Sequence, residues 1–571
     1  IARDGSAQCA IVVAAEASAP VQHAAKELAF FLNLITGAHF TIAPHADRRH
    51  ANILVGPQAA RYAEPDWSAD GLGHDGLVIK TVGHDLILAG GHPRGTLYAV
   101  FSFLEDELGC RWWTSTASTI PHRPTLSAHD LDIRYRPPFA YRESFWFDAF
   151  DGDWAVRNKC NGNGFRLDAA HGGKIAYAGF VHTAYQLIPP DKYFQEHPEW
   201  FSLIDGKRTH EQGQLCLTND ALRRELVRNL KKQLRAHPDA YITSVSQNDN
   251  FGNCQCNRCR GVDEEEASPA GTLLRFVNRV AADIEGEFPD VTVSTLAYQY
   301  TRHPPKRTRP RHNVMVRLCS IECSFAKALT DDRNRAFRDD LLGWSNITDR
   351  LYVWDYVTNF RHYLLPHANL RVLGPNIRFF RDHHVQGVME QGAYTSIGTE
   401  MAPLRAWVLA KLLWNPSRDD KALIEEFAQG YFKQGARPIL EYLAMLHDST
   451  DAAGDYVGFY DRAEQANALS LTLLSNALRL FAEAQQAVSD QPEPATRVRI
   501  ATMPVIYAFL VRWDSLKQQA AETDTPWPIS EDIQAVHKQF IELAALGNVT
   551  RLGESRGLDL LQQAVDEIAN R

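Results

Sequence analysis

The sequence predicts an α/β protein in which a (β/α)8 TIM-like barrel follows a small α/β domain and precedes a helical C-terminal region. Strand-like and helical segments mix at the start of the chain, short β-branched and aromatic segments alternate with helical ones in the middle, and strand signals largely vanish near the end. We place the domains at 1–135, 136–420 and 421–571. A length of 571 residues suits this division, since domains usually hold roughly 100–200 residues.

The first domain is predicted to order its elements β-α-β-β-β-α. Apolar runs predict the strands and 3.6-residue spacing predicts the helices. The expected strands are 10–14, 53–56, 76–82 and 85–89, and the expected helices are 20–34 and 94–107. Gly90, Gly91 and Gly95 lack the Lys-Ser/Thr of a phosphate loop, so we expect them to turn a strand into a helix. No cofactor motif is recognised in the chain, and we expect none.

The middle of the chain is predicted to form the barrel, because eight strands alternate with helices. The strands are 141–147, 162–167, 174–181, 241–246, 291–299, 314–318, 351–354 and 385–389. The helices are 220–236 after an Asn219 cap, 269–288, 331–344 and 369–383. From Pro403 onward the Ala, Leu, Glu, Gln and Lys content predicts helices packed on one another and on the barrel.

Charge and hydropathy exclude two classes of function. Sixty Lys and Arg against 69 Asp and Glu give a net charge of −9, and Arg302–Arg311 is the one long basic run, so nucleic-acid binding has little electrostatic support. The prolines of that run predict a stiff, solvated loop rather than a site for an anionic ligand. No stretch of about 18 apolar residues is present, so we expect no membrane span. The chain begins at Ile1, and we expect a secreted or periplasmic protein whose export signal has been removed.

Four carboxylates follow predicted barrel strands, where a barrel of this type holds its catalytic groups. They are Asp249, Glu322, Asp355 and Glu390. Glycosidic bond cleavage needs such groups, because one carboxyl must protonate the leaving oxygen while another group stabilises positive charge at the anomeric carbon. Each has a structural alternative: Asp249 as a turn residue, the others as members of buried ion pairs. Glu390 is favoured because it closes an apolar strand and needs a partner or a function there.

Other candidates are expected to bind substrate. His182 ends a predicted strand and can hydrogen-bond a sugar hydroxyl, although a lone histidine is often structural. Four aromatic residues at or near strand ends can stack on a pyranose face or belong to the core: Trp146, Tyr298, Trp354 and Tyr394.

The spacing Cys254-x-Cys256-x2-Cys259 directly follows Asp249. Three thiolates at this spacing suit one zinc ion with a fourth ligand from Cys319, Cys323 or a histidine. The second Cys-x2-Cys pair of a complete zinc motif is missing, so a disulfide or reduced thiols that brace the loop are favoured over zinc. We expect no metal at the catalytic carboxylates.

Two parts of the chain resemble known families. Residues 85–121 (DLILAGGHPRGTLYAVFSFLEDELGCRWWTSTASTIP) resemble the α/β domain that precedes the barrel in α-glucuronidases and β-hexosaminidases. Residues 140–445 resemble the bacterial domain of unknown function 4838, grouped as glycoside hydrolase family 163. The resembling segments are HPEWFSLIDGKR (197–208), QLCLTN (214–219), SVSQNDNFGNCQCNRCR (244–260), LLRFVNRVA (273–281), LYVWDYVTNF (351–360) and GVMEQGAY (387–394).

The second resemblance implies a retaining endo-β-N-acetylglucosaminidase that acts on N-glycans or glycoproteins by substrate-assisted catalysis. There the nucleophile is the 2-acetamido oxygen of the substrate, and the enzyme supplies an acid and a group that polarises the amide. Asn248-Asp249 fits the end of strand four, with Asn248 as the amide partner and Glu390 as the competing acid. Another glycosidase, either an α-glucuronidase or an exo-β-N-acetylhexosaminidase, and a catalytically silent glycan-binding protein remain alternatives.

Overall fold

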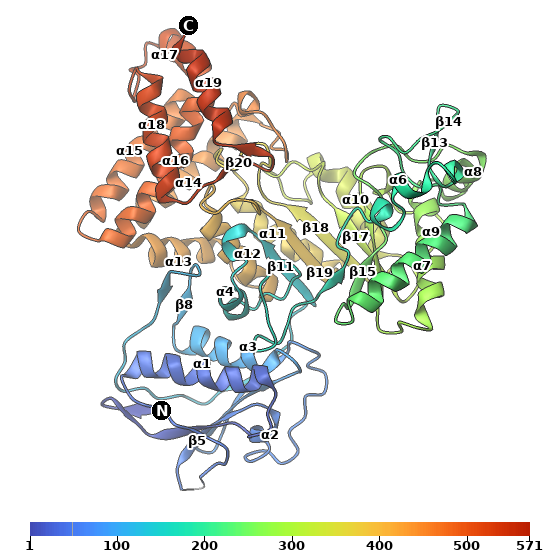
Figure 1. Cartoon of the computed structure of the whole chain (residues 1–571). Coiled ribbons are helices and arrows are strands. Elements are labelled where there is room, and N and C mark those ends of the chain that lie inside the picture. The colour runs from blue at the N-terminus through green and yellow to red at the C-terminus, as the bar shows by residue number, and fades with distance from the viewer. Residues whose placement is uncertain (48) are drawn as a thin grey trace. The chain divides into compact units, whose positions relative to one another are not determined.

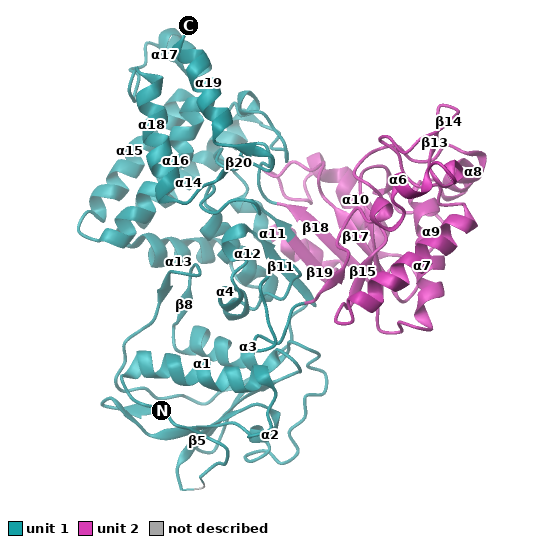
Figure 2. Cartoon of the chain, viewed as in Figure 1, with its two compact units in different colours: residues 1–174, 357–374, 390–571 teal, residues 175–356, 375–389 magenta. Residues whose placement is uncertain are grey.

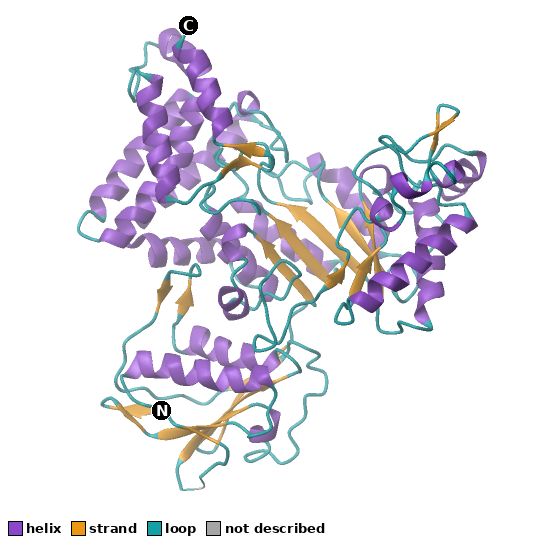
Figure 3. Cartoon of the chain, viewed as in Figure 1, coloured by secondary structure: helices purple, strands orange, loops and turns teal. Residues whose placement is uncertain are grey.

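The chain forms two compact units. The structure, a computed structural model, describes residues 1–47 and 49–571. Unit 1 comprises residues 1–174, 357–374 and 390–571, and unit 2 comprises 175–356 and 375–389 (Figure 2). Unit 1 holds an N-terminal α/β sheet and a helical C-terminal region, and unit 2 is built on parallel strands (Figures 1 and 3).

The N-terminal sheet of unit 1 has six strands in the order β10-β6-β7-β5-β3-β4. They are β3 (Cys9–Val12), β4 (Ile42–Ala43), β5 (Ala51–Val55), β6 (Leu77–Val82), β7 (Asp85–Gly90) and β10 (Asp132–Tyr135). Strands β4, β3, β5 and β7 pair in parallel, whereas β6 pairs antiparallel with both of its neighbours, β7 and β10.

Two helices pack together on this sheet, α1 (Ala19–Thr36) and α3 (Gly95–Ser102), and α3 continues as a π-helical turn to Glu107 (Figure 1). The six predicted elements are present, but strand β4 and the short helix α2 (Pro57–Ala60) lie between them and were not predicted. A Cβ atom added to Gly90 would lie 2.4 Å from the carbonyl carbon of Gly95, so the strand can reach the helix this closely only without a side chain.

Unit 2 contains a parallel half-barrel. Its strands are β12 (Tyr177–Ala178), β15 (Ile242–Ser244), β16 (Thr292–Ala297), β17 (Val314–Cys319) and β18 (Leu351–Tyr356). They pair in parallel in the order β12-β15-β16-β17-β18. The chain reaches β19 (Gly387–Gln391) after Gln386, whose backbone N–H donates to the Leu351 carbonyl at 2.8 Å.

The second of the eight predicted barrel strands is wrong. Residues 162–167 form turns and irregular backbone in unit 1. The amide of Gly164 donates to the Glu143 carboxylate and the amide of Asn163 donates to the Tyr141 hydroxyl at 3.1 Å, so side chains take the hydrogen bonds that a neighbouring strand would need. The predicted strand 174–181 shrinks to the two residues of β12.

The remaining predicted barrel strand, β11 (Tyr141–Phe145), lies in unit 1. Beyond it, the Gly392 amide donates to the Phe145 carbonyl at 3.0 Å. The helices after the strands also match their predictions: α7 (Asp220–Ala236), α9 (Ala270–Glu285), α10 (Arg335–Ser345) and α11 (Leu370–Asp382).

Helix α7 illustrates how the sequence sets these elements. The Asn219 side-chain oxygen accepts from the amides of Ala221 and Leu222 at 2.9 and 3.2 Å, as an N-cap should. Leucines at helical spacing then bury one face of the helix, namely Leu222, Leu226, Leu230 and Leu234. Helix α8 (Asn257–Glu266) was not among the predicted helices.

The C-terminal part of unit 1 is helical, as predicted (Figure 3). Its helices are α12 (Ala402–Trp414), α13 (Asp420–Phe432), α14 (Ala436–Ala453), α15 (Leu471–Ala487), α16 (Pro492–Val511), α17 (Trp513–Thr523), α18 (Ile533–Leu546) and α19 (Asp559–Ala569). A two-stranded hairpin, β20 (Arg551–Gly553) and β21 (Arg556–Gly557), interrupts them. Across residues 1–47 and 49–571, no helix has the length and apolar character that crossing a bilayer requires.

Unit 1 also buries a charged cluster around Glu105. This carboxylate is 1% exposed and forms ion pairs with Lys159 and Lys411, which are equally buried. Although burial alone would raise the pKa of Glu105, the two ammonium groups hold it well below its usual range. The cluster joins the end of α3 to the loop at Lys159 and to helix α12.

Candidate functional site

The carboxyl ends of the parallel strands in unit 2 carry several of the predicted site residues. Asp249 follows β15, Tyr298 follows β16, and Glu322 follows β17. Because parallel strands end at the same edge of their sheet, side chains from separate parts of the sequence gather there. The negative charges of Asp249 and Glu322 both act on the Tyr298 hydroxyl, which places the three groups near one another.

Asp249 is exposed and is oriented by neutral donors. Its Oδ1 accepts from the Tyr298 hydroxyl at 2.9 Å and from the Gln299 side-chain amide at 3.2 Å. Among the described residues no hydrogen bond reaches its Oδ2, so that oxygen is available to a ligand. An aspartate held at one oxygen and open at the other is suited to accept a proton or an N–H group from a substrate.

Tyr298 stays protonated and acts as the donor in this pair. Its side chain is buried, and burial together with the Asp249 charge raises the pKa of the phenol far above its usual range. The next residue, Gln299, has a left-handed backbone with φ of 52°. Such a conformation is unfavourable for a residue with a side chain, and it occurs often at functional sites.

The loop that carries Asp249 is fixed on both sides of it. The Asn248 amide donates to the Gln214 side chain at 2.8 Å, and the Asn248 side chain donates to the Gly213 carbonyl at 3.0 Å. Before it, the buried Gln247 side chain donates to the Thr301 hydroxyl at 2.7 Å. The structure therefore gives the Asn248 side-chain nitrogen a contact inside the loop, while Asp249 projects from it.

His182 is half-buried at the same edge. Its Nδ1 lies 2.8 Å from the Gln247 carbonyl oxygen, which can only accept, so Nδ1 carries the proton and Nε2 is the acceptor of the neutral ring. The ring centre lies 6.1 Å from that of Tyr298, and the backbone is left-handed with φ of 51°. This position is compatible with a hydrogen bond to a substrate hydroxyl.

Glu322 is exposed and forms an ion pair with the first residue of the basic run. Arg302 Nη1 donates to Glu322 Oε2 at 2.8 Å, and Arg302 Nε donates to Asp340 at 2.7 Å. Farther along the run, Arg307 and Arg311 form ion pairs with carboxylates of α8 and α9. Arg302 was not predicted to reach the strand ends, and its place in a basic run gave no specific signal for it.

Asp355 and Trp354 point to opposite faces of β18, because neighbouring residues of a strand alternate. Asp355 is 3% exposed, and its Oδ1 accepts from the Ser320 hydroxyl and from the Tyr356 amide. Burial raises the pKa of Asp355 to about 6. Trp354 packs instead on Phe180, with the Arg317 guanidinium 5.4 Å from its ring centre.

The other three predicted site residues belong to unit 1. Glu390 is the fourth residue of β19 and is 1% exposed. Trp146 is equally buried and packs so tightly on the backbone that a Cβ atom at Gly392 would lie 2.0 Å from its ring. Tyr394 is half-buried, stacks on Phe145 at 5.3 Å and donates to Glu554 at 2.6 Å. The burial of Trp146 is that of a core residue.

All nine cysteines are free thiols in the structure, so no disulfide bridges the loop after Asp249. Cys254, Cys256 and Cys259 do gather, and a fourth cysteine joins them: Cys216. Cys319 and Cys323, which we considered as the fourth ligand, are not part of this group. Cys216 lies in the QLCLTN segment (214–219), which was noted in the sequence. Its contact with the other three cysteines was not predicted, because they lie far from it in the sequence.

Comparison with known families agrees with this architecture. Residues 112–444, more than half of the chain, match the model of the family described as Domain of unknown function (DUF4838). The chain belongs to the DUF4838 family. Residues 3–103 of this DUF4838 protein match the Glycosyl hydrolase family 67 N-terminus. Both resemblances seen in the sequence are confirmed at this level, whereas membership of glycoside hydrolase family 163 stays a prediction.

No curated protein matches the chain. A solved structure described as "a novel family GH115 4-O-Methyl-alpha-glucuronidase, BtGH115A, with specificity for decorated arabinogalactans" is similar over 98% of this chain and 79% of that chain, with 12% identity and a TM-score of 0.61. The DUF4838 protein therefore shares the fold of a glycoside hydrolase. A second structure, described as "Structure of CpGH84D", covers 99% of this chain and 96% of that chain with 10% identity and a TM-score of 0.46.

Proposed function

We propose that this protein is a retaining glycoside hydrolase that cleaves a β-linked N-acetylglucosamine bond within an N-glycan, with the 2-acetamido group of the substrate as nucleophile. The observation that carries the proposal is Asp249, which Tyr298 and Gln299 hold at one oxygen while the other stays open at the strand ends. The proposal includes an exported protein and a glycan or glycoprotein substrate.

In this mechanism Asp249 Oδ2 accepts the N–H of the acetamido group. The carbonyl oxygen of that group becomes more nucleophilic and attacks the anomeric carbon as the bond to the leaving oxygen breaks. Asp249 takes the nitrogen proton, which leaves a neutral oxazoline, and water then opens the oxazoline at the anomeric carbon while Asp249 returns the proton to nitrogen. The Tyr298 hydroxyl and the Gln299 amide keep the carboxylate in place. His182 Nε2 is a candidate acceptor for a sugar hydroxyl.

The leaving oxygen must receive a proton from a second carboxyl group. Glu322 is less suited to this step, because its carboxylate is already engaged in an ion pair with Arg302. Asp355 has a raised pKa of about 6. However, its carboxylate accepts a hydrogen bond from the Ser320 hydroxyl, and it lies on the face of β18 opposite to Trp354. Glu390, which the sequence favoured as the acid, is 1% exposed in unit 1, and the variants below test its role.

The test combines product analysis with an inhibitor. The purified protein should release an intact glycan that lacks one N-acetylglucosamine from a defined N-glycoprotein, as seen by mass spectrometry, and an N-acetylglucosamine thiazoline should inhibit it as an oxazoline mimic. Asp249→Asn, Glu322→Gln, Asp355→Asn and Glu390→Gln are assayed in parallel. Undiminished turnover in all four variants would overturn this site, and cleavage insensitive to the thiazoline would overturn the acetamido mechanism.

An α-glucuronidase is the second candidate, favoured by the match of residues 3–103 to the Glycosyl hydrolase family 67 N-terminus and by the shared fold with a GH115 α-glucuronidase. Release of 4-O-methylglucuronic acid from a decorated polysaccharide, without release of N-glycans, would select it. Release of single terminal N-acetylglucosamine residues would select an exo-β-N-acetylhexosaminidase. Binding of glycans without any cleavage would select a silent binding protein.

A further inference from the structure

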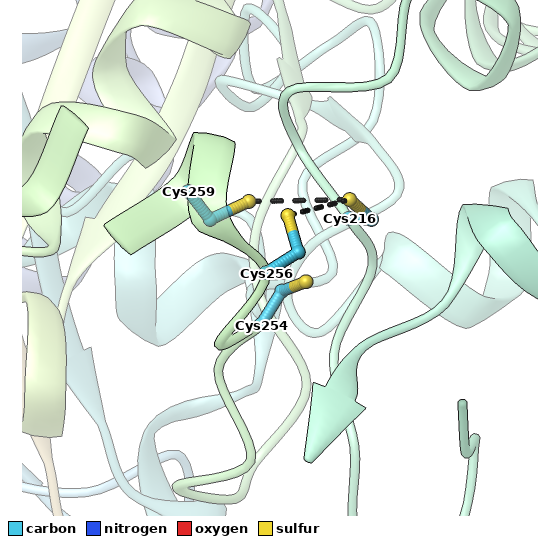
Figure 4. Close-up of side chains that lie close together, drawn as sticks. All are labelled: Cys216, Cys254, Cys256 and Cys259. Atoms are coloured by element: carbon cyan, nitrogen blue, oxygen red, sulfur yellow. Dashed lines mark hydrogen bonds between the residues drawn. The ribbon is translucent and has the colours of Figure 1, made fainter. Parts of the chain in front are cut away.

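Four cysteines from two separate segments of unit 2 meet at one point. Cys216 lies just before α7. Cys254 and Cys256 lie on the segment that leads into α8, and Cys259 lies in the first turn of that helix. Each side chain offers one sulfur, and the four sulfurs all lie within 4.8 Å of one another. Figure 4 shows the four side chains directed toward a common centre.

The sulfur separations fit one tetrahedral metal ion. Cys216 Sγ lies 3.7 Å from Cys256 Sγ and 3.9 Å from Cys259 Sγ. A zinc–sulfur bond of about 2.3 Å places the corners of a tetrahedron about 3.8 Å apart. A disulfide requires about 2.05 Å, so the arrangement differs from two bridged pairs.

The surroundings of the cluster favour anionic sulfur. The Leu203 amide donates to Cys254 Sγ at 3.3 Å, and the Arg208 guanidinium lies 3.7 Å from the same atom. The Thr218 hydroxyl lies 3.3 Å from Cys259 Sγ. Backbone and side-chain donors of this kind stabilise the negative charge of metal-bound thiolates. Three of the four cysteines are buried, so their sulfurs are largely shielded from water.

We propose that Cys216, Cys254, Cys256 and Cys259 bind one zinc ion as a structural site. Each thiol loses its proton to solvent as its sulfur forms a bond to zinc, and neither the metal nor sulfur changes oxidation state. Four protein thiolates complete the coordination shell and leave no position for a catalytic water. Soft thiolate ligands in a tetrahedral arrangement favour zinc over calcium or magnesium.

The zinc ion would secure the loop that carries Asp249. Two residues before Cys216, the Gln214 side chain donates to the carbonyl oxygens of Asn248 and Asn250, each at 2.9 Å. Cys254 follows Asp249 by five residues. The ion would therefore join two segments. One carries Gln214, whose side chain holds the loop around Asp249, and the other carries Asp249 itself. This role needs no assumption about the reaction that the protein catalyses.

The first test is the metal content of the wild-type protein. The full chain is produced in zinc-supplemented medium, purified under reducing conditions without chelator and analysed by inductively coupled plasma mass spectrometry. We expect one zinc per chain. Cobalt exchanged into the site should give the absorption bands of a tetrahedral tetrathiolate complex. Less than about a tenth of a zinc per chain with no such bands, or stoichiometric iron instead, would overturn the proposal.

A matched pair of variants separates the site from cysteine content in general. Cys216→Ala should lower the zinc content at least tenfold, whereas Cys110→Ala, which removes a buried thiol of unit 1, should leave it at one per chain. If Cys216→Ala fails to fold, the wild-type zinc content and cobalt spectrum still decide the question. Full zinc content in a folded Cys216→Ala protein would overturn the four-cysteine assignment.

Discussion

Two carboxylates in the two units are held in contrasting ways. Glu105 in unit 1 is 1% exposed and is neutralised by Lys159 and Lys411. Asp249 in unit 2 is exposed and receives hydrogen bonds from the neutral Tyr298 and Gln299 at a single oxygen. Cations that surround a carboxylate neutralise its charge, so the group contributes to the stability of the fold. Neutral donors orient a carboxylate but do not neutralise it, so its negative charge can still act on a substrate. The donor set therefore distinguishes a structural carboxylate from a candidate catalytic one.

The largest effect is expected on activity at Asp249. Asp249→Asn keeps the size of the side chain and removes its charge, so kcat/KM on the cleaved glycan should fall about 10²–10⁴-fold, the usual loss for a proton-transferring or polarising group. The melting temperature should stay within a degree or two, because no ion pair is broken. A fall in stability that accounts for the lost activity would place Asp249 in the same class as Glu105.

Glu105→Gln should have the opposite signature. Removing the carboxylate leaves Lys159 and Lys411 buried without their counter-charge, which costs about 3–5 kcal/mol when one partner of a buried ion pair is lost. Denaturant unfolding measures this change in the free energy of unfolding. The fraction that remains folded should keep its kcat. An unchanged denaturation midpoint would show that the cluster does not depend on Glu105.

A smaller effect is expected at Tyr298. Tyr298→Phe removes the hydroxyl that orients Asp249. A hydrogen bond to a charged group contributes about 1.5–3 kcal/mol, so kcat should fall about 10- to 150-fold. Tyr300→Phe is the control, since Tyr300 lies two residues away and, among the described residues, the hydrogen bonds to the Asp249 side chain come from Tyr298 and Gln299. Equal losses in both variants would argue against a specific orienting role.

A further effect concerns stability and pH. Burial raises the pKa of Asp148 in unit 1 to about 7. An aspartate of the unfolded chain titrates near pH 4, so between pH 4 and 7 the folded state retains a proton that the unfolded state has released, and stability falls as pH rises. Asp148→Asn removes this loss. We expect the variant to gain up to about 1.4 kcal/mol over wild type for each pH unit between pH 4 and pH 7.

Thermal unfolding at a series of pH values checks this prediction. The difference between Asp148→Asn and wild type should grow from pH 4 to pH 7 and then stay constant. A difference that does not vary with pH would mean that Asp148 titrates alike in the folded and unfolded chain.

Local sequence patterns predicted most helices and strands, because the buried apolar residues of such an element repeat with its own period. Helix α7 with its Asn219 cap is the clearest case. The strand predicted for residues 162–167 was wrong, because their apolar and glycine residues were interpreted as a strand. In the structure, backbone amides of this segment donate hydrogen bonds to the Glu143 carboxylate and the Tyr141 hydroxyl. Side chains that compete for backbone hydrogen bonds leave no periodic signal.

The sequence predicted which residues lie at the strand ends, but it did not predict which of them contact one another. Asp249 and Tyr298 were both candidates, but their bond joins residues 49 positions apart, and Gln299 was not predicted. Cys216 lies 40 residues from Cys256, and its own segment contains no second cysteine that would indicate a metal ligand. Contacts of this kind follow from the pairing of the strands, which a single sequence does not determine.

The buried ion cluster of unit 1 also sets the order of events when the chain is synthesised. Lys159 follows Glu105 by 54 residues, but Lys411 follows it by 306, and all of unit 2 is made in between. Contacts between such distant residues form late, because they require closure of a long loop. A growing chain that ends before helix α12 would therefore hold Glu105 with one of its two cations, and its N-terminal domain would mature only after the ribosome has passed Lys411.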